Sequence, residues 1–135
     1  MISIGNKAFF EKIITEQDVI LFSTIIGDSN LIHTDEIFAQ SLGFKGKIVH
    51  GLLTASLIST VIGTKLPGIG SIYLKQILNF IKPVFINDRI KACVEVINIE
   101  KNIVNLKTYC INQNSIIVLD GEATIKVPPS LLTGR

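Results

Sequence analysis

The sequence has no Trp, only two Tyr and no run of Lys or Arg among its 135 residues, and its net charge is +2. It therefore lacks both the aromatic stacking platform and the basic stripe typical of nucleic-acid binding. The longest nearly apolar run, 51–63, is too short to span a bilayer, and residues 1–7 contain no signal-peptide core. We expect a cytoplasmic protein that binds neither nucleic acid nor a membrane.

Metal-binding patterns are also scarce. Cys93 and Cys110 are the only cysteines and do not form a metal motif, so we expect small core residues with free thiols. Asp35, Glu36 and the two histidines could ligate a metal by number alone, but the two carboxylates are better explained as charges in the first turn of a helix. We expect no metal.

Apolar residues, in contrast, are abundant, at 47% of the chain against 18% charged residues. This length and composition predict one domain over 1–135 with ample material for one core. The apolar surplus predicts a surface covered by a partner, and a homodimer is the commonest solution.

The first third of the chain predicts a strand over 7–14 and a helix over about 16–26. Thr15 and Asp18 have the spacing of an N-cap and its N3 carboxylate, and Gly27 can end the helix.

A second, short helix is predicted to start at Thr34, with Asp35 and Glu36 in its first turn and Gly43 as its stop. The segment 27–33 is then a loop held at both ends by helices.

The rest of the chain predicts one buried helix and a sheet. The stretch 50–65 has an apolar surface nearly all round and only Ser, Thr and Gly between its apolar residues, so it must be buried on most sides. Strands are expected over 71–80, 89–100, 103–112 and 115–127, the last three as an antiparallel meander. A curved antiparallel sheet wrapped around a long central helix is the hot-dog fold, of the α+β class.

The hairpin between the second and third of these strands allows a prediction of register. If Lys101-Asn102 is a two-residue turn, Glu100 pairs with Ile103 and Cys93 lies opposite Cys110.

Acid–base chemistry is predicted in the loop 27–33, where Asp28, Asn30 and His33 occur within six positions. An imidazole with a pKa of about 6.5 beside a carboxylate suits proton transfer at neutral pH. By itself, however, Gly-Asp-x-Asn is ordinarily a turn. Gly51 begins the buried helix, where its N–H and the helix dipole can stabilise charge on a carbonyl oxygen.

Several segments together resemble the MaoC-like (R)-specific enoyl-CoA hydratases. They are Gly27-Asp28-Ser29-Asn30-Leu31-Ile32-His33, Ile48-Val49-His50-Gly51-Leu52-Leu53, Leu66-Pro67-Gly68-Ile69-Gly70-Ser71-Ile72-Tyr73, Phe80-Ile81-Lys82-Pro83-Val84-Phe85 and Gly121-Glu122-Ala123. The resemblance runs almost from end to end.

This resemblance implies a dimer of hot-dog subunits that hydrates a trans-2-enoyl-CoA, reversibly, to the (R)-3-hydroxyacyl-CoA. It also implies a lyase of fatty acid metabolism with no cofactor, since coenzyme A is part of the substrate. Asp28 and His33 match the catalytic pair of the family by position, and we expect a short acyl chain. Leu31 departs from the motif, which usually has Pro there, so this loop lacks a rigidifying ring.

By the same matching, further residues fall at positions of support and substrate binding. Asn30 would support the loop, and Gly51 would donate to the thioester oxygen. His50 could cap the buried helix or pack beneath the loop. Ser59 could contact the site floor or bond a carbonyl one turn back. Ile62 is not part of this matching, but it lies one turn beyond Ser59 and could line the acyl pocket or belong to the core.

Three other functions remain open on the sequence. The same pair could dehydrate 3-hydroxyacyl groups on an acyl carrier protein, which would need a basic entrance patch. An acyl-CoA thioesterase would need water aimed at the carbonyl carbon. An idle acyl-binding hot-dog subunit would have no need of both Asp28 and His33.

Overall fold

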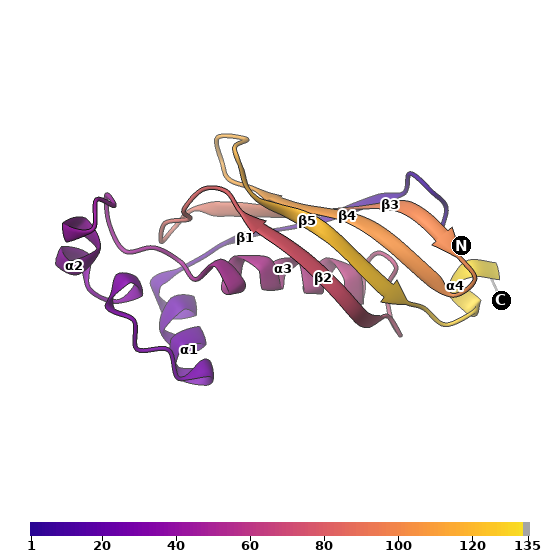
Figure 1. Cartoon of the computed structure of the whole chain (residues 1–135), viewed down its shortest axis with the longest axis horizontal. Coiled ribbons are helices and arrows are strands. Elements are labelled where there is room, and N and C mark those ends of the chain that lie inside the picture. Colours follow the sequence, from indigo (N-terminus) through magenta and orange to yellow (C-terminus); the bar gives the residue numbers. More distant parts are fainter. Residues whose placement is uncertain (134–135) are drawn as a thin grey trace.

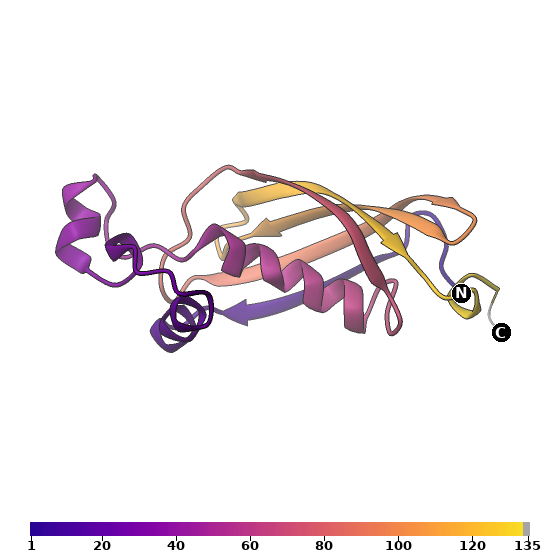
Figure 2. The ribbon, with the colours of Figure 1, turned by 60° about the horizontal axis from the view of Figure 1, so that its bottom comes forward.

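The uncharged helix α3 (Gly51–Thr64) is packed along one face of a curved sheet in the computed structural model, which describes residues 1–133 (Figure 1 and Figure 2). The sheet has five antiparallel strands in the order β1-β3-β4-β5-β2, and β3, β4 and β5 form the predicted meander. The α+β hot-dog prediction is confirmed. The strands are β1 (Lys7–Ile13), β2 (Ile72–Phe80), β3 (Arg89–Glu100), β4 (Ile103–Ile111) and β5 (Ile117–Lys126).

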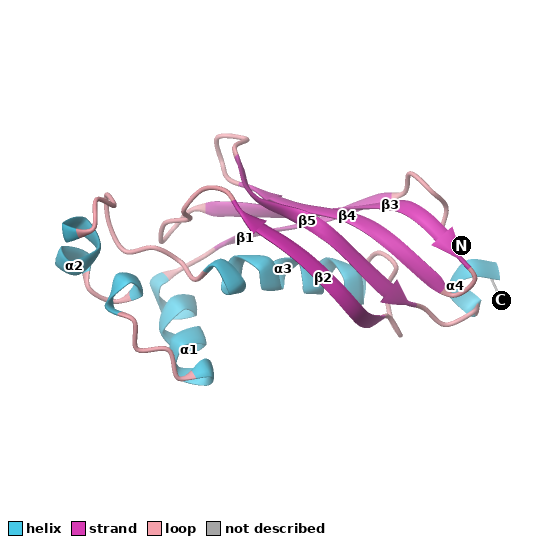
Figure 3. Ribbon diagram, in the orientation of Figure 1, coloured by secondary structure: helices cyan, strands magenta, loops and turns pink. Residues whose placement is uncertain are grey.

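The remaining helices lie outside this layer. Beyond one end of the sheet are α1 (Glu16–Ile26), the 3-10 turn η1 (Leu31–His33) and α2 (Glu36–Ser41) (Figure 3). The short helix α4 (Ser130–Thr133) follows β5 at the opposite end. No helix within residues 1–133 has the length and hydropathy needed to cross a membrane.

The predicted capping of α1 is confirmed, whereas that of α2 is wrong by one residue. Thr15 accepts from the Asp18 amide while the Asp18 carboxylate accepts from the Thr15 amide, and Gly27 ends α1 at φ +73°. For α2 the N-cap is Asp35, whose carboxylate accepts from the Phe38 amide at 3.0 Å. Thr34 instead closes the 3-10 turn η1, which the sequence had not predicted.

The predicted register of the β3–β4 hairpin is right at its turn and wrong further along. Glu100 pairs with Ile103, but a β-bulge at Ile97 adds one residue to β3. Cys93 therefore faces Tyr109, and Cys110 faces Ala92. A bulge of this kind shifts every later pair by one position.

The core forms where α3 meets the sheet. Ile58, Val61 and Ile62 of α3 are buried against strand residues such as Val94 and Leu106. Both cysteines are free and buried, as predicted. Burial of this continuous apolar layer is the main force that holds α3 in the concave face of the sheet.

Candidate active site

The loop after α1 is shaped by its own polar side chains. The Asp28 amide donates to the Ser23 carbonyl at the end of α1. One carboxylate oxygen of Asp28, Oδ1, accepts from the Asn30 amide at 2.9 Å, and the Asn30 side chain in turn accepts from the Ile32 amide at the start of η1. Asn30 therefore supports the loop, and Oδ2 of Asp28 is left to face the site.

His33 ends η1 and is held by the segment that leads into α3. Its Nδ1 lies 2.7 Å from the Ile48 carbonyl oxygen. Because a carbonyl can only accept, Nδ1 carries a proton, and in the neutral ring the lone pair is on Nε2. That Nε2 faces Asp28 Oδ2 at 3.9 Å, with side chains 10% and 31% exposed respectively.

The separation between Asp28 and His33 suits a shared water. At 3.9 Å the two atoms are too far apart for a direct hydrogen bond. A water oxygen about 2.8 Å from each would subtend an angle of about 90°, which is compatible with one hydrogen bond to each group. The pair can thus hold a water molecule and exchange protons with it.

His50 lies beneath this pair and does not cap α3. It occupies the N-cap position but makes no side-chain capping bond, so that alternative is wrong and packing beneath the loop is confirmed. Its ring stacks on His33 at a centroid distance of 3.7 Å and an interplanar angle of 23°. Its Nε2 lies 2.9 Å from Ser23 Oγ and 3.8 Å from Asp28 Oδ2. Burial lowers the pKa of His50, and the neighbouring His33 lowers it further, against an opposing effect of Asp28.

Asp28, His33 and His50 bring one oxygen and two ring nitrogens within 4.8 Å of one another, which raises the question of a metal ion. A metal-bound imidazole directs its nitrogen lone pair at an ion about 2.0–2.1 Å away. The lone pairs of these two nitrogens lie in ring planes that are stacked 3.7 Å apart, so they do not both point at an ion at that distance. The arrangement suits proton transfer better than metal binding. Asp35 and Glu36 lie outside it, because the first caps α2 and the second accepts from the Lys47 amide.

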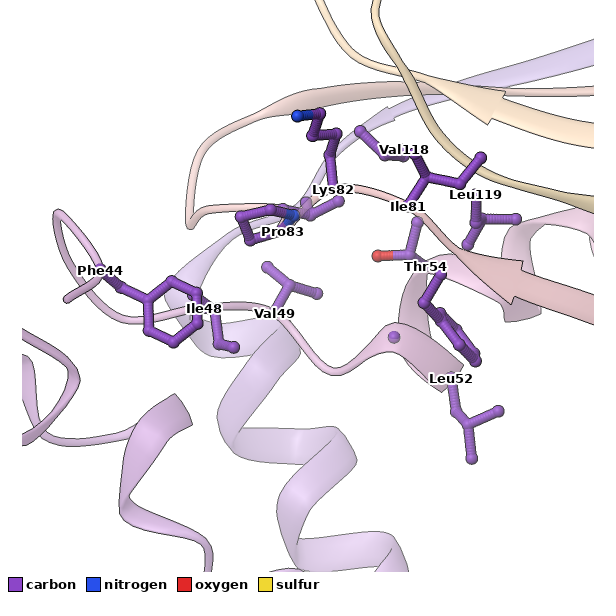
Figure 4. A pocket seen from close by; sticks show the side chains of 13 residues that line it. Phe44, Ile48, Val49, Leu52, Thr54, Ile81, Lys82, Pro83, Val118 and Leu119 are labelled. Carbon is purple, nitrogen blue, oxygen red and sulfur yellow. The ribbon is translucent and has the colours of Figure 1, made fainter. Parts of the chain in front are cut away.

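A pocket of about 510 Å³ opens beside the first turn of α3 (Figure 4). Its lining is mostly apolar and includes Phe44, Ile48, Val49, Gly51, Leu52, Phe80, Pro83, Val118 and Leu119. The Phe80 ring lies so close to Gly51 that a Cβ there would be 2.6 Å from Cε1 of the ring. Thr54 also lines the pocket, and its buried hydroxyl has no hydrogen-bond partner within residues 1–133.

Two of the predicted site residues lie apart from the pair within one chain. Ser59 is on the exposed face of α3, and Ile62 is buried in the core, one turn further along. Neither lines the pocket beside Gly51.

Ser23 and Thr54 were not predicted as site residues. Ser23 of α1 meets His50, the residue before α3, across a separation of 27 positions in the sequence, and no local pattern encodes that contact. Thr54 could have been noticed in the sequence only as a hydroxyl residue within a strongly apolar helix, which is a weak indication of a site residue.

The comparison with known proteins gives one consistent result. A family model described as MaoC like domain matches residues 4–117. The (R)-specific enoyl-CoA hydratase of Rhodospirillum rubrum is 43% identical over 126 residues, which is 92% of this chain and 87% of the relative. The 3-hydroxybutyryl-CoA dehydratase of Methylorubrum extorquens is 43% identical over 129 residues, which is 94% of this chain and 82% of the dehydratase. The solved structure of the (R)-hydratase of Aeromonas caviae involved in PHA biosynthesis has a TM-score of 0.91 and 40% identity, covering 94% of this chain and 98% of that one.

Proposed function

Since the chain belongs to the MaoC-like domain family, we propose that it is an (R)-specific hydratase of short trans-2-enoyl-CoA thioesters, forming (R)-3-hydroxyacyl-CoA reversibly. The observation that carries this proposal is the placement of Asp28 Oδ2 opposite His33 Nε2 at 3.9 Å. The named relatives are a hydratase and a dehydratase, which favours a lyase over a thioesterase or an idle acyl-binding subunit.

In this mechanism Asp28 and His33 share the water. One of them removes a proton from the water as its oxygen bonds to C3 of the enoyl group, and the electrons of the double bond move toward the thioester carbonyl. The pair then delivers a proton to C2, which leaves both groups in their starting states. Positioned acids and bases of this kind contribute about 10²- to 10⁴-fold in rate.

The negative charge that develops on the thioester oxygen needs a hydrogen-bond donor, and the backbone amide of Gly51 is the best candidate. The first amides of a helix have no partner within the helix, and the helix dipole favours negative charge there. Gly51 lies at the start of α3, three residues after Ile48. The same segment therefore carries both the Gly51 amide and the Ile48 carbonyl that holds His33. Loss of one such donor typically raises a barrier by about 3–4 kcal/mol.

We place the acyl chain in the apolar pocket beside Gly51. A thioester whose oxygen meets the Gly51 amide can direct an apolar chain between Phe80 and Leu119, which both line the pocket. Ile62 lies eleven residues beyond Gly51, about 16 Å further along the helix, so it would limit only longer chains. An activity scan of chain length with Ile62→Ala tests this: an unchanged length profile would remove Ile62 as a determinant.

We propose that the chain forms a homodimer and that β2 lies at its interface. This strand lies at one end of the sheet order, and its exposed apolar residues include Ile72, Leu74, Ile77 and Phe80. An unpaired apolar edge strand readily pairs with another strand. Light scattering of the purified protein should give twice the chain mass, and Ile77→Lys should shift it toward the monomer.

A cytoplasmic location is supported by the thiols. Cys93 and Cys110 are both free and lie on neighbouring strands, as is usual in a reducing compartment. Cell fractionation tests the location directly.

The reaction itself is tested with crotonyl-CoA. Wild-type protein should remove the enoyl absorbance and yield the (R) alcohol, whereas Asp28→Asn should lower kcat by about 10²-fold or more. Asp35→Asn is the matched control, because Asn caps a helix about as well as Asp and should leave activity unchanged. Release of free CoA without hydration would support a thioesterase, and preference for the acyl-carrier-protein thioester would reassign the carrier.

A further inference from the structure

Asp28 and His33 transfer the protons in the proposed mechanism, whereas His50 transfers none although it lies against both of them. Its side chain is 4% exposed and lies between α1, η1 and the start of α3. One face stacks on His33, and Phe22 of α1 meets the ring edge-on at a centroid distance of 5.0 Å. A polar ring buried this completely needs a physical reason.

The stacked pair of imidazoles can carry only one positive charge. Two like charges whose ring centres are 3.7 Å apart repel strongly, and burial disfavours the charged form of His50 more than that of the more exposed His33. Of the two rings, His50 is therefore the one that remains neutral.

The hydrogen bond to Ser23 fixes the orientation of the neutral ring. Nε2 of His50 faces both Ser23 Oγ at 2.9 Å and the carboxylate of Asp28 at 3.8 Å. A proton on Nε2 turns the positive end of the N–H bond toward that carboxylate, whereas the other tautomer would turn a lone pair toward it. Ser23 is therefore the acceptor that anchors His50 to α1.

We propose that His50, anchored by Ser23, is a positioning residue that fixes the ring plane of His33, so that Nε2 of His33 stays opposite Asp28 Oδ2. The Ile48 carbonyl holds one edge of the His33 ring, and that single bond still allows the ring to tilt about it. Stacking on His50 removes this freedom. The support matters here because the loop has Leu31 and no Pro to stiffen it. This role rests on the proposed hydratase function.

Three variants separate the parts of this support. His50→Ala removes both ring and anchor, His50→Phe keeps a flat ring without the anchor, and Ser23→Ala removes only the anchor. We expect kcat to fall about 10- to 100-fold in His50→Ala, as for other supports of catalytic ligands. In Ser23→Ala it should fall about three- to tenfold, the effect of one hydrogen bond. KM should change less than about twofold in each, since none of these groups is assigned to substrate.

Thr24→Ala is the matched control for Ser23→Ala. It removes a hydroxyl from the adjacent residue of the same helix, but that hydroxyl donates to the Ile20 carbonyl of α1 and faces solvent. Its kcat should equal that of the wild type.

Nitrogen NMR of the His33 ring gives a readout that does not depend on turnover. All variants should keep the tautomer protonated on Nδ1, because the bond to the Ile48 carbonyl remains. The ring signals of His33 should nevertheless be broader in His50→Ala and Ser23→Ala than in wild type, because the ring can tilt, with the remaining backbone amide spectrum preserved. If His50→Ala does not fold, His50→Phe and Ser23→Ala carry the test.

Unchanged kcat and unchanged His33 ring signals in the folded variants would overturn the positioning role. A wild-type protein with no hydratase activity but the expected NMR signals would overturn the proposed function and leave the contact between the two rings intact.

Discussion

Replacing His33 by its two amide analogues separates the halves of its ring. In His33→Asn the side-chain amide nitrogen can occupy the position of Nδ1 and keep the 2.7 Å bond to the Ile48 carbonyl, while nothing replaces Nε2. In His33→Gln the amide reaches the position of Nε2, opposite Asp28, but cannot accept or release a proton at neutral pH. Both variants therefore remove proton transfer and differ in the contact that they keep.

The expected loss follows from that geometry. Each variant should lower kcat about 10²- to 10⁴-fold, which corresponds to about 3–5 kcal/mol of barrier. The free energy of unfolding should change by less than about 1 kcal/mol in His33→Asn, because the bond to Ile48 is kept. Crotonyl-CoA hydration and denaturant unfolding, measured on the same samples, give both values. A folded His33→Asn that retains more than about one tenth of the wild-type kcat would refute proton transfer by His33.

Further predictions concern stability and reactivity. Burial lowers the pKa of His50 in the folded protein, so the contribution of its neutral ring to stability is fully present above about pH 6.5. This contribution is lost as the pH falls, because the unfolded chain takes up the proton first. His50→Phe should therefore lose less unfolding free energy than the wild type between pH 7.5 and 5.5, which are each about one unit from that value. Burial raises the pKa of Cys110 to about 12, so Ellman's reagent should modify this thiol rapidly only after unfolding, and rapid reaction of the native protein would contradict its placement. A Cβ at Gly121 would lie 1.7 Å from the Ile77 carbonyl oxygen, so Gly121→Ala should destabilise the protein by about 3 kcal/mol or more, whereas Gly63→Ala, with open space in α3, should be neutral or stabilising.

Local patterns predicted most of the fold. Apolar periodicity located α3 and the four later strands to within two residues at their ends, because burial depends on which residues are apolar. The misplaced start of α2 and the shifted register of β3 have a different origin. Both Thr34 and Asp35 can cap a helix, and the choice depends on η1. The bulge at Ile97 adds a residue that no pairing rule anticipates.

The part of the candidate site that is local in the sequence was also predictable. Asp28 and His33 occur in one short loop, so their proximity is a local property of the chain. The stacking of His50 on His33 and its bond to Ser23 join three segments, and such contacts follow from tertiary packing alone. Sequence could show that His50 was present, and only the structure shows that its ring stacks on His33 and does not cap α3.

The most direct test of the central claim is a double-mutant cycle between Asp28 and His33, followed by crotonyl-CoA hydration. If the two groups act as one unit on a shared water, Asp28→Asn, His33→Gln and the double variant should all be slowed to nearly the same kcat. If the two groups acted independently, the loss of kcat in the double variant would instead be the product of the losses in the two single variants. That result would contradict the shared-water mechanism.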